Sequence, residues 1–240
     1  MAESGRIALV TGASRGIGRA AAVALAAAGH HVVLVARTVG GLEETDDLVR
    51  AAGGSATLVP LDLKDFAALD RLGASIFERW GRLDAWFANA GVLGALSPLA
   101  HLDPKLLDEL VAVNITANGR LIRSLDPLLR ASAAGRVLFM SSTVARQPRA
   151  FWGGYAMSKA ALESLALTYA AECAETGVRV NILNPGATRT AMRARAMPGE
   201  DPVTLPTPEE LAPLIVEMLS AGWDKNGELV NFKEWTQPSP

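Results

Sequence analysis

The chain has 240 residues, half of them hydrophobic, and a formal net charge of −2 at pH 7. That length and apolar share suffice for one large core, and the scattered, near-neutral charge argues against nucleic acid or a membrane surface as a partner. Because there is no apolar run of about 18 residues and no signal-peptide pattern at the N-terminus, we expect a cytoplasmic protein.

Apolar, β-rich runs alternate with segments of helical periodicity along the chain. The expected strands are 6–10, 31–36, 57–62, 83–90, 136–142, 178–186 and 228–232. The expected helices are 17–28, 41–52, 66–80, 103–130 and 155–176. Because most of these strands are apolar on both faces, the order predicts an α/β fold. It is a single-domain, Rossmann-like, doubly wound parallel β-sheet over residues 1–240, flanked by helices on both faces.

Two features fall outside this alternation. Residues 187–208, rich in Pro, Thr, Met and Arg, interrupt the pattern and predict an irregular substrate lid. The only cysteine, Cys173, excludes a disulfide within the chain, and the three histidines lack the spacing of metal ligands. We therefore predict no metal site.

A glycine-rich loop, TGASRGIG at 11–18, directly follows the first expected strand and leads into a helix. In this order Gly12 can form the tight turn, Gly16 lets the backbone approach a diphosphate, and Gly18 lets the helix pack on the sheet. A glycine pattern by itself is weak. Its position between a strand and a helix nevertheless favours dinucleotide binding over a purely structural turn.

The tip of the second expected strand indicates which dinucleotide is bound. Strands that bind NAD commonly end in a carboxylate that contacts the adenosine ribose, whereas this strand ends in Arg37. Arg37 and Arg15 of the glycine loop are placed to bind a ribose 2′-phosphate, which favours NADP(H) over NAD(H). The alternative is that both arginines are solvated surface residues.

Tyr155 and Lys159 lie four residues apart at the start of an alanine-rich helical segment, so their side chains share one face. By itself such a pair is more typical of a helix surface than of a site. Ser142, at the end of the fifth expected strand, and Asn114, inside a helical segment, are equally ambiguous when taken singly.

Together these motifs resemble those of the short-chain dehydrogenases/reductases over nearly the whole chain. The loop at 11–18 is similar to the family's TGxxxGxG, and Asp62–Leu63 to its adenine-binding pair. Asn89–Ala90–Gly91 is similar to the NNAG segment, with Ala88 in place of the first Asn, and residues 185–190 resemble the PGxxxT segment that holds the nicotinamide end. The predicted cofactor-binding residues are Gly12, Ser14, Arg15, Gly16, Ile17, Gly18, Arg37, Asp62, Leu63, Asn89, Ala90, Gly91, Tyr155, Lys159, Pro185, Gly186, Thr188 and Thr190.

The resemblance further implies a catalytic tetrad of Asn114, Ser142, Tyr155 and Lys159, and hydride transfer between NADP(H) and a carbonyl or alcohol substrate. Tyr155 would act as general acid/base and Ser142 would orient the substrate oxygen. Asn114 would bend its helix and hold a water that links Lys159 to solvent. Since a phenol has an ordinary pKa of ~10, we expect the positive charges of Lys159 and the oxidised nicotinamide to lower the pKa of Tyr155.

Three segments are expected to select the substrate: the residues after Gly91, the loop after Ser142, and 187–208. The apolar candidates are Leu93, Val144, Trp152, Met192 and Met197, and the possible anion-binding residues are Arg146, Arg149, Arg193 and Arg195. Two substrate classes stay open. One is a carbonyl compound with a nearby anionic group, such as a 3-oxoacyl thioester, and the other is a small neutral ketone or alcohol.

The segments 103–130 and 155–176 carry more apolar surface than one sheet face requires. The resemblance implies that they pair across a two-fold axis, giving a homodimer or homotetramer, although the chain lacks the family's usual DGG ending. Two alternatives to an NADP(H)-dependent reductase also stay open. One is an NAD-preferring dehydrogenase or epimerase-like relative on the same fold. The other is a dinucleotide-sensing protein without turnover, which would not need an intact tetrad.

Overall fold

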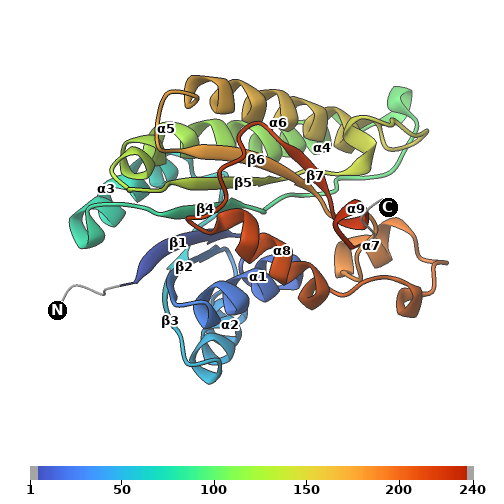
Figure 1. The fold of residues 1–240 in the computed structure, drawn as a ribbon. Coiled ribbons are helices and arrows are strands. Elements are labelled where there is room, and N and C mark those ends of the chain that lie inside the picture. The colour runs from blue at the N-terminus through green and yellow to red at the C-terminus, as the bar shows by residue number, and fades with distance from the viewer. Residues whose placement is uncertain (1–4, 237–240) are drawn as a thin grey trace.

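Seven parallel strands form one sheet in the computed structural model, which describes residues 5–236 (Figure 1). In chain order they are β1 (Arg6–Thr11), β2 (His30–Ala36), β3 (Ser55–Pro60), β4 (Ala85–Ala88), β5 (Arg136–Met140), β6 (Arg179–Asn184) and β7 (Leu229–Asn231). Their order across the sheet is β3-β2-β1-β4-β5-β6-β7, and neighbouring strands are parallel. The order reverses between β1 and β4, the point at which doubly wound sheets bind ligands.

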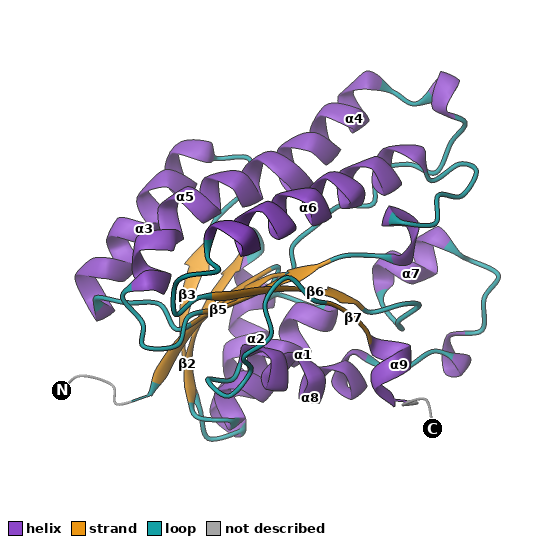
Figure 2. Ribbon diagram, turned by 45° about the horizontal axis from the view of Figure 1, so that its top comes forward, coloured by secondary structure: helices purple, strands orange, loops and turns teal. Residues whose placement is uncertain are grey.

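Helices cover both faces of this sheet (Figures 1 and 2). One face carries α1 (Gly16–Ala27), α2 (Val39–Ala51) and α8 (Pro208–Leu219). The other carries α3 (Phe66–Trp80), α4 (Pro104–Leu110), α5 (Ala117–Arg130) and α6 (Gly153–Glu172), with a π-helical segment, Val111–Thr116, joining α4 to α5. Two short helices, α7 (Ala191–Ala196) and α9 (Phe232–Thr236), lie near the ends of β6 and β7 (Figure 1).

Each strand buries alternate side chains against the two helix layers. On β1, Ile7 and Leu9 join the core beneath α3, α5 and α6, while Ala8 and Val10 join the core beneath α1 and α8. Because both faces are covered, every second residue is as apolar as its neighbours, which accounts for the continuous hydrophobic runs in the sequence.

The amino ends of the strands hold a buried polar cluster around Asp84. Its carboxylate accepts hydrogen bonds from the backbone N–H of Ile7 (2.8 Å) and the hydroxyl of Ser132 (2.5 Å), and Arg6 donates to nearby carbonyls. Burial lowers the pKa of His30, and the charge of Arg6 lowers that pKa further, so the ring is neutral at pH 7. The cluster satisfies buried backbone groups and serves the fold.

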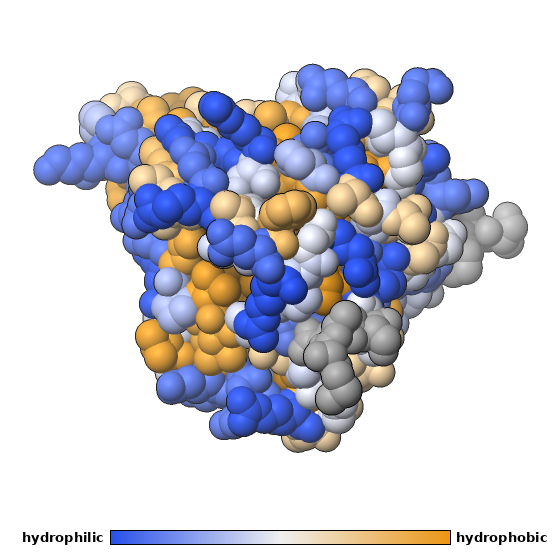
Figure 3. Space-filling model, turned by 90° about the vertical axis from the view of Figure 1, so that its left-hand side faces the viewer, coloured by the Kyte–Doolittle hydropathy of each residue, from blue (hydrophilic) through white to orange (hydrophobic). Residues whose placement is uncertain are grey.

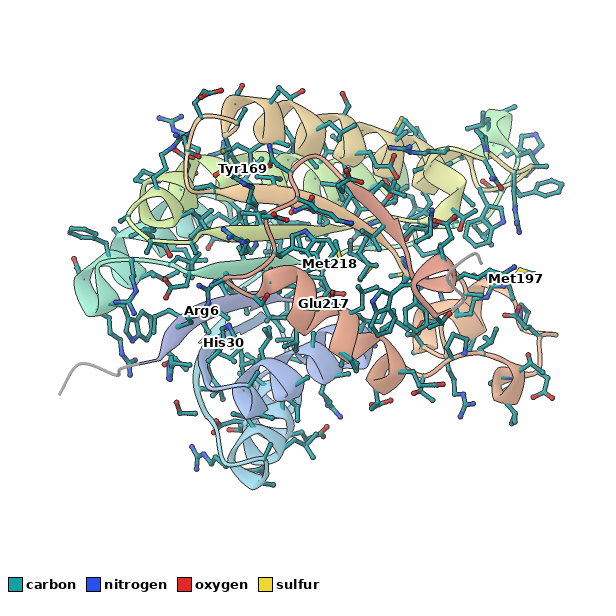
Figure 4. The ribbon with its side chains drawn as sticks, in the orientation of Figure 1. Arg6, His30, Tyr169, Met197, Glu217 and Met218 are labelled. Atoms are coloured by element: carbon teal, nitrogen blue, oxygen red, sulfur yellow. The ribbon has the colours of Figure 1, made fainter. Side chains whose placement is uncertain are left out.

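This cluster lies far from the carboxyl ends of the strands. Figure 4 shows Arg6 and His30 at one end of the sheet and Met197 at the other. Figure 3 views the molecule from the Arg6 side, where hydrophilic and hydrophobic residues are interspersed. Within residues 5–236, no group of three or more His, Cys, Asp or Glu side chains is placed to hold a metal ion. In the same described range, no helix has the length and apolarity needed to cross a membrane.

The predicted α/β sheet is confirmed, and so are its seven strands and five helical segments, with ends shifted by a few residues. The prediction that 187–208 is irregular is wrong for α7, and α8 and α9 were not predicted. The sequence does carry a signal for α8, because Thr207 caps the helix, Pro208 starts it and Glu210 completes a capping box. A prediction based on apolar periodicity alone does not detect this capping signal.

Gly73 allows α3 and α5 to pack closely, which gives a test of this layer. A Cβ at Gly73 would lie 2.1 Å from the carbonyl oxygen of Ser124, whereas a Cβ at Gly40, on α2, would meet nothing within 4 Å. We expect Gly73→Ala to lower the free energy of unfolding by about 1–3 kcal/mol through overpacking. Gly40→Ala should leave it equal or raise it by about 0.5–1 kcal/mol. Urea denaturation of both variants measures the difference, and equal stabilities would contradict the packing.

Candidate active site

A cavity of about 700 Å³ opens at the carboxyl ends of the central strands. The predicted site residues that line it are Gly12, Ser14, Arg15, Gly16, Ile17, Arg37, Asp62, Leu63, Asn89, Ala90, Gly91, Ser142, Tyr155, Lys159, Pro185, Gly186, Thr188 and Thr190. Two predicted residues, Gly18 and Asn114, do not line it. The fold therefore brings together motifs that are up to about three quarters of the chain apart, because each motif follows the end of a different strand.

The glycine loop forms the floor of one half of the cavity. Gly12 and Gly16 have φ angles of +69° and +55°, in the left-handed region that favours glycine. Gly18 packs instead of lining the cavity, since a Cβ there would lie 2.2 Å from the carbonyl oxygen of Gly12. Helix α1 begins at Gly16, so its unpaired N–H groups face the cavity and favour an anion there.

Arg15 and Arg37 both line the cavity beside this loop, and both are exposed. Within residues 5–236 neither guanidinium forms an ion pair with a carboxylate. Both are therefore available to an external anion. Two residues beside them, Thr38 and Gly41, also line the cavity and were not predicted. The signal for Thr38 was its position directly after Arg37 at the tip of β2.

Tyr155 lies in the first turn of α6, where its phenol faces the cavity and receives little solvent. Burial raises the pKa of Tyr155 to about 12, and a hydrogen bond with the hydroxyl of Ser142 opposes this rise only partly. The protein's own residues therefore shift this pKa upward, opposite to the predicted lowering. Burial of the phenol is the main cause of this rise, and Lys159 does not contribute to it.

Lys159 lies one helical turn after Tyr155 and is also buried. Its Nζ donates a hydrogen bond to the carbonyl oxygen of Met140 (2.7 Å) and lies 5.8 Å from the centroid of the Tyr155 ring. Burial lowers the pKa of Lys159 to about 8, while the charge of Glu163 acts in the opposite direction. At neutral pH the ammonium form still predominates.

Asn114 lies in the π-helical segment and is fully buried. Its Nδ2 donates to the carbonyl oxygen of Val92 (3.0 Å) and the hydroxyl of Ser158 (2.9 Å), and its Oδ1 accepts from the backbone N–H of Val92 (2.9 Å). Ser158 in turn donates to the carbonyl oxygen of Tyr155 (2.8 Å). Asn114 therefore ties the helix break to the first turn of α6.

The half of the cavity beside Tyr155 is largely apolar. Of the predicted substrate-selecting residues, Leu93, Trp152, Met192 and Arg193 line it. Val144 packs behind them in a small buried cluster with Tyr155, and Met197 lies outside the lining. Val92 and Ala196, which also line the cavity, lie within the predicted substrate-selecting segments, whereas the apolar lining residue Val113 was not predicted.

Three of the four predicted anion-binding arginines are already engaged by the protein. Arg193 forms a two-point ion pair with Glu200 (2.5 and 2.6 Å), Arg195 donates to the carbonyl oxygen of Gly94 (2.6 Å), and Arg146 binds the carboxylate of Glu163 (2.7 Å). Of the four, Arg193 alone lines the cavity, and its charge is paired with Glu200. The lining beside Tyr155 is therefore mainly apolar, rather than the mixed apolar and cationic rim predicted from the sequence.

Comparison with known proteins identifies the family. The sequence model of a family described as short chain dehydrogenase matches residues 6–201. The chain belongs to this family. The uncharacterized oxidoreductase YciK of Escherichia coli K12 is 41% identical over 217 residues, covering 89% of this chain and 86% of that protein. An uncharacterized NAD-dependent oxidoreductase of Mycobacterium tuberculosis, strain CDC 1551, is 37% identical over 202 residues, covering 78% and 73%.

A solved structure agrees with the fold of this short-chain dehydrogenase. The short chain dehydrogenase of Shigella flexneri, complexed with NADP, superposes with a TM-score of 0.90 at 39% identity, covering 94% of this chain and 96% of that one. The predicted family and the Rossmann-like fold are therefore confirmed. The protein is therefore an oxidoreductase of the short-chain dehydrogenase family.

Proposed function

We propose that the protein transfers a hydride between NADP(H) and a carbonyl or alcohol substrate, with Tyr155 as general acid/base. The observation that carries this proposal is the meeting of Ser142, Tyr155 and Lys159 in the same cavity as the glycine loop. A phenol, a hydroxyl and an ammonium group close to the nicotinamide are suited to proton transfer coupled to hydride transfer. These three groups lie beside the glycine-rich loop that would bind the dinucleotide.

The residues present fit a bound NADP(H). The positive φ angles of Gly12 and Gly16 and the first turn of α1 suit a diphosphate, and Arg15 and Arg37 suit a 2′-phosphate. When bound, NADPH supplies the hydride that the carbonyl carbon accepts. Lys159 would hold the nicotinamide ribose hydroxyls.

In the direction of reduction, Ser142 donates a hydrogen bond to the carbonyl oxygen and holds it toward Tyr155. As the carbon gains hydride, Tyr155 gives its phenolic proton to that oxygen. Because burial raises the pKa of Tyr155 to about 12, the phenol is protonated at neutral pH and ready to donate. Oxidation needs the phenolate, which the charge of Lys159 and an oxidised nicotinamide would both stabilise.

The remaining family roles belong to the same proposal. Asn114 fixes the π-helical segment against α6. Its backbone carbonyl oxygen, which accepts from Nδ2 of Asn118 (2.9 Å), would also hold the water that links Lys159 to solvent. Residues 187–208 would act as a lid, since Arg195 reaches across to Gly94. We also propose a cytoplasmic location and a homodimer or homotetramer formed through α5 and α6.

For the substrate, the lining favours a small neutral ketone or alcohol over a 3-oxoacyl thioester. With Arg193 neutralised by Glu200, an anionic group would be desolvated without a partner. We expect NADPH-dependent reduction of benzil, a neutral diketone, with a kcat/KM at least about tenfold above that for acetoacetyl-coenzyme A. The decrease in NADPH absorbance measures both.

The Arg193–Glu200 pair provides a control for this preference. Glu200→Gln removes the carboxylate charge, so the freed guanidinium should raise the relative kcat/KM for acetoacetyl-coenzyme A. If the wild-type protein already preferred the thioester, the neutral-substrate proposal would be wrong. If neither compound nor any other carbonyl in a broader panel were reduced, the sensor alternative would gain.

A further inference from the structure

We propose that Glu163 is a positioning residue for the site, because it holds the segment that carries Ser142 from both sides and lies one helical turn after Lys159. Glu163 does not itself line the cavity, although it contacts the lining residue Ser141, and the proposed reaction assigns it no part. The inference rests on the proposed function for its catalytic meaning. Its physical content, the coupling of Glu163 to Lys159, is testable without any substrate.

The carboxylate of Glu163 is buried, with 6% of the residue exposed, and both of its oxygens are engaged. Oε1 accepts a hydrogen bond from the hydroxyl of Ser141 (2.5 Å), and Oε2 accepts one from Nε of Arg146 (2.7 Å). A buried carboxylate is costly unless it is paired in this way. The arrangement is therefore a specific one that resists movement of its partners.

The two partners of Glu163 flank Ser142. Ser141 immediately precedes it and is fixed to the sheet through its own N–H, which donates to the carbonyl oxygen of Leu183 (2.8 Å). Arg146 follows the short 3₁₀ helix Thr143–Ala145 that begins directly after Ser142. One carboxylate thus fixes the chain before and after the hydroxyl that would orient the substrate.

Glu163 is also coupled to Lys159. Tyr155, Lys159 and Glu163 are spaced by four residues on α6, so they form one stripe along the helix. Glu163 raises the pKa of Lys159 against the larger lowering by burial. From the elements packed against this stripe, the charged group that contacts Glu163 within residues 5–236 is Arg146.

Glu163 affects the pH at which Lys159 loses its positive charge. Lys159 is an ammonium below its pKa of about 8 and loses its charge as the pH rises through that value. Removing the negative charge of Glu163 lowers this pKa, so the charge is lost at a lower pH. Any rate that needs the ammonium then declines at a lower pH as well.

Glu163→Gln tests the inference with little change of shape, because the amide can still accept from Arg146 and donate to Ser141. Lysine labelled with a carbon isotope allows Lys159 to be titrated by NMR in the whole chain. The other four lysines, Lys64, Lys105, Lys225 and Lys233, are exposed, and Lys159→Ala assigns the remaining signal. We expect the pKa of Lys159 to fall by about one pH unit in Glu163→Gln. An unchanged pKa would overturn the inference.

Arg146→Ala is the matched control. It breaks the same ion pair but removes a positive charge, so the pKa of Lys159 should stay or rise. Thermal unfolding of each variant checks that it folds, and a merely structural role would lower the melting temperature in both without the opposite pKa responses. A fall of the Lys159 pKa in Arg146→Ala as large as in Glu163→Gln would contradict the inference.

Catalysis is measured separately with NADPH and benzil. We expect Glu163→Gln to lower kcat by about fivefold at pH 8 and little at pH 6, with little change in the dissociation constant of NADPH from fluorescence titration. If Tyr155→Phe were as active as the wild type, the proposed function would fail while the Lys159 titration still decided this inference. If kcat fell equally at both pH values, the ammonium part of the inference would be wrong.

Discussion

Tyr155→Phe is expected to lower kcat for NADPH-dependent carbonyl reduction by about a thousandfold, because the substrate oxygen loses its proton donor. The change removes one oxygen atom from a side chain that lines the cavity together with Ser142. The rest of the ring remains to pack beside Trp152. The dissociation constant of NADPH, measured by fluorescence titration, should therefore change by less than about threefold.

Tyr169→Phe is the matched control, since the chain has two tyrosines and both are on α6. The Tyr169 hydroxyl donates to Asp126 (2.9 Å), away from the cavity lining. We expect this variant to lose about 0.5–1.5 kcal/mol of stability while it keeps its kcat. Equal loss of turnover in both variants would point to a general effect on the fold.

The same pair of variants separates the enzyme from the binding-protein alternative. If the wild type and Tyr155→Phe bound NADPH equally and neither consumed it with any carbonyl, the protein would be a dinucleotide-binding module. Spectrophotometric titration of tyrosinate adds a measurement that needs no substrate. It should place the ionisation of Tyr155 well above pH 10, because burial opposes the phenolate.

Much of the cofactor half of the site was predictable from the sequence, because its residues are attached to strand ends. Gly12 and Gly16 follow β1, Arg37 follows β2, and Asp62 follows β3. In a parallel sheet all of these ends lie on one edge, so recognising the strands is enough to bring the motifs together. Gly18 is an exception, because it belongs to the same glycine-rich loop but packs against the loop instead of lining the cavity.

Several lining residues of the substrate half were predicted, but its charge was not, because that charge depends on side-chain partners. The sequence shows four arginines near this region, but not that Glu200 neutralises Arg193 or that Arg195 binds a backbone carbonyl. The direction of the Tyr155 pKa has the same origin. Sequence spacing places Lys159 nearby, whereas the burial that raises this pKa is known only once the helices are packed.

Arg37→Asp is expected to reduce the ratio of kcat/KM for NADPH to that for NADH by about a thousandfold. Losing charge-assisted hydrogen bonds to a 2′-phosphate costs about 1.5–3 kcal/mol, which is about tenfold to a hundredfold. The new carboxylate repels the phosphate and can bind the ribose hydroxyls of NADH, which accounts for the remainder. Arg37 is exposed at the cavity edge, so the fold should be unaffected.

Two further variants make this prediction specific. Arg71→Asp, on the exposed side of α3 and outside the cavity lining, makes the same change in net charge and should leave the cofactor ratio unchanged. Arg15→Ala should lower the ratio less than Arg37→Asp, and the two effects should not add if both guanidinium groups bind one phosphate. If the wild type used NADH as well as NADPH, and Arg37→Asp left the ratio unchanged, both arginines would be surface residues. The NAD-preferring alternative would then hold.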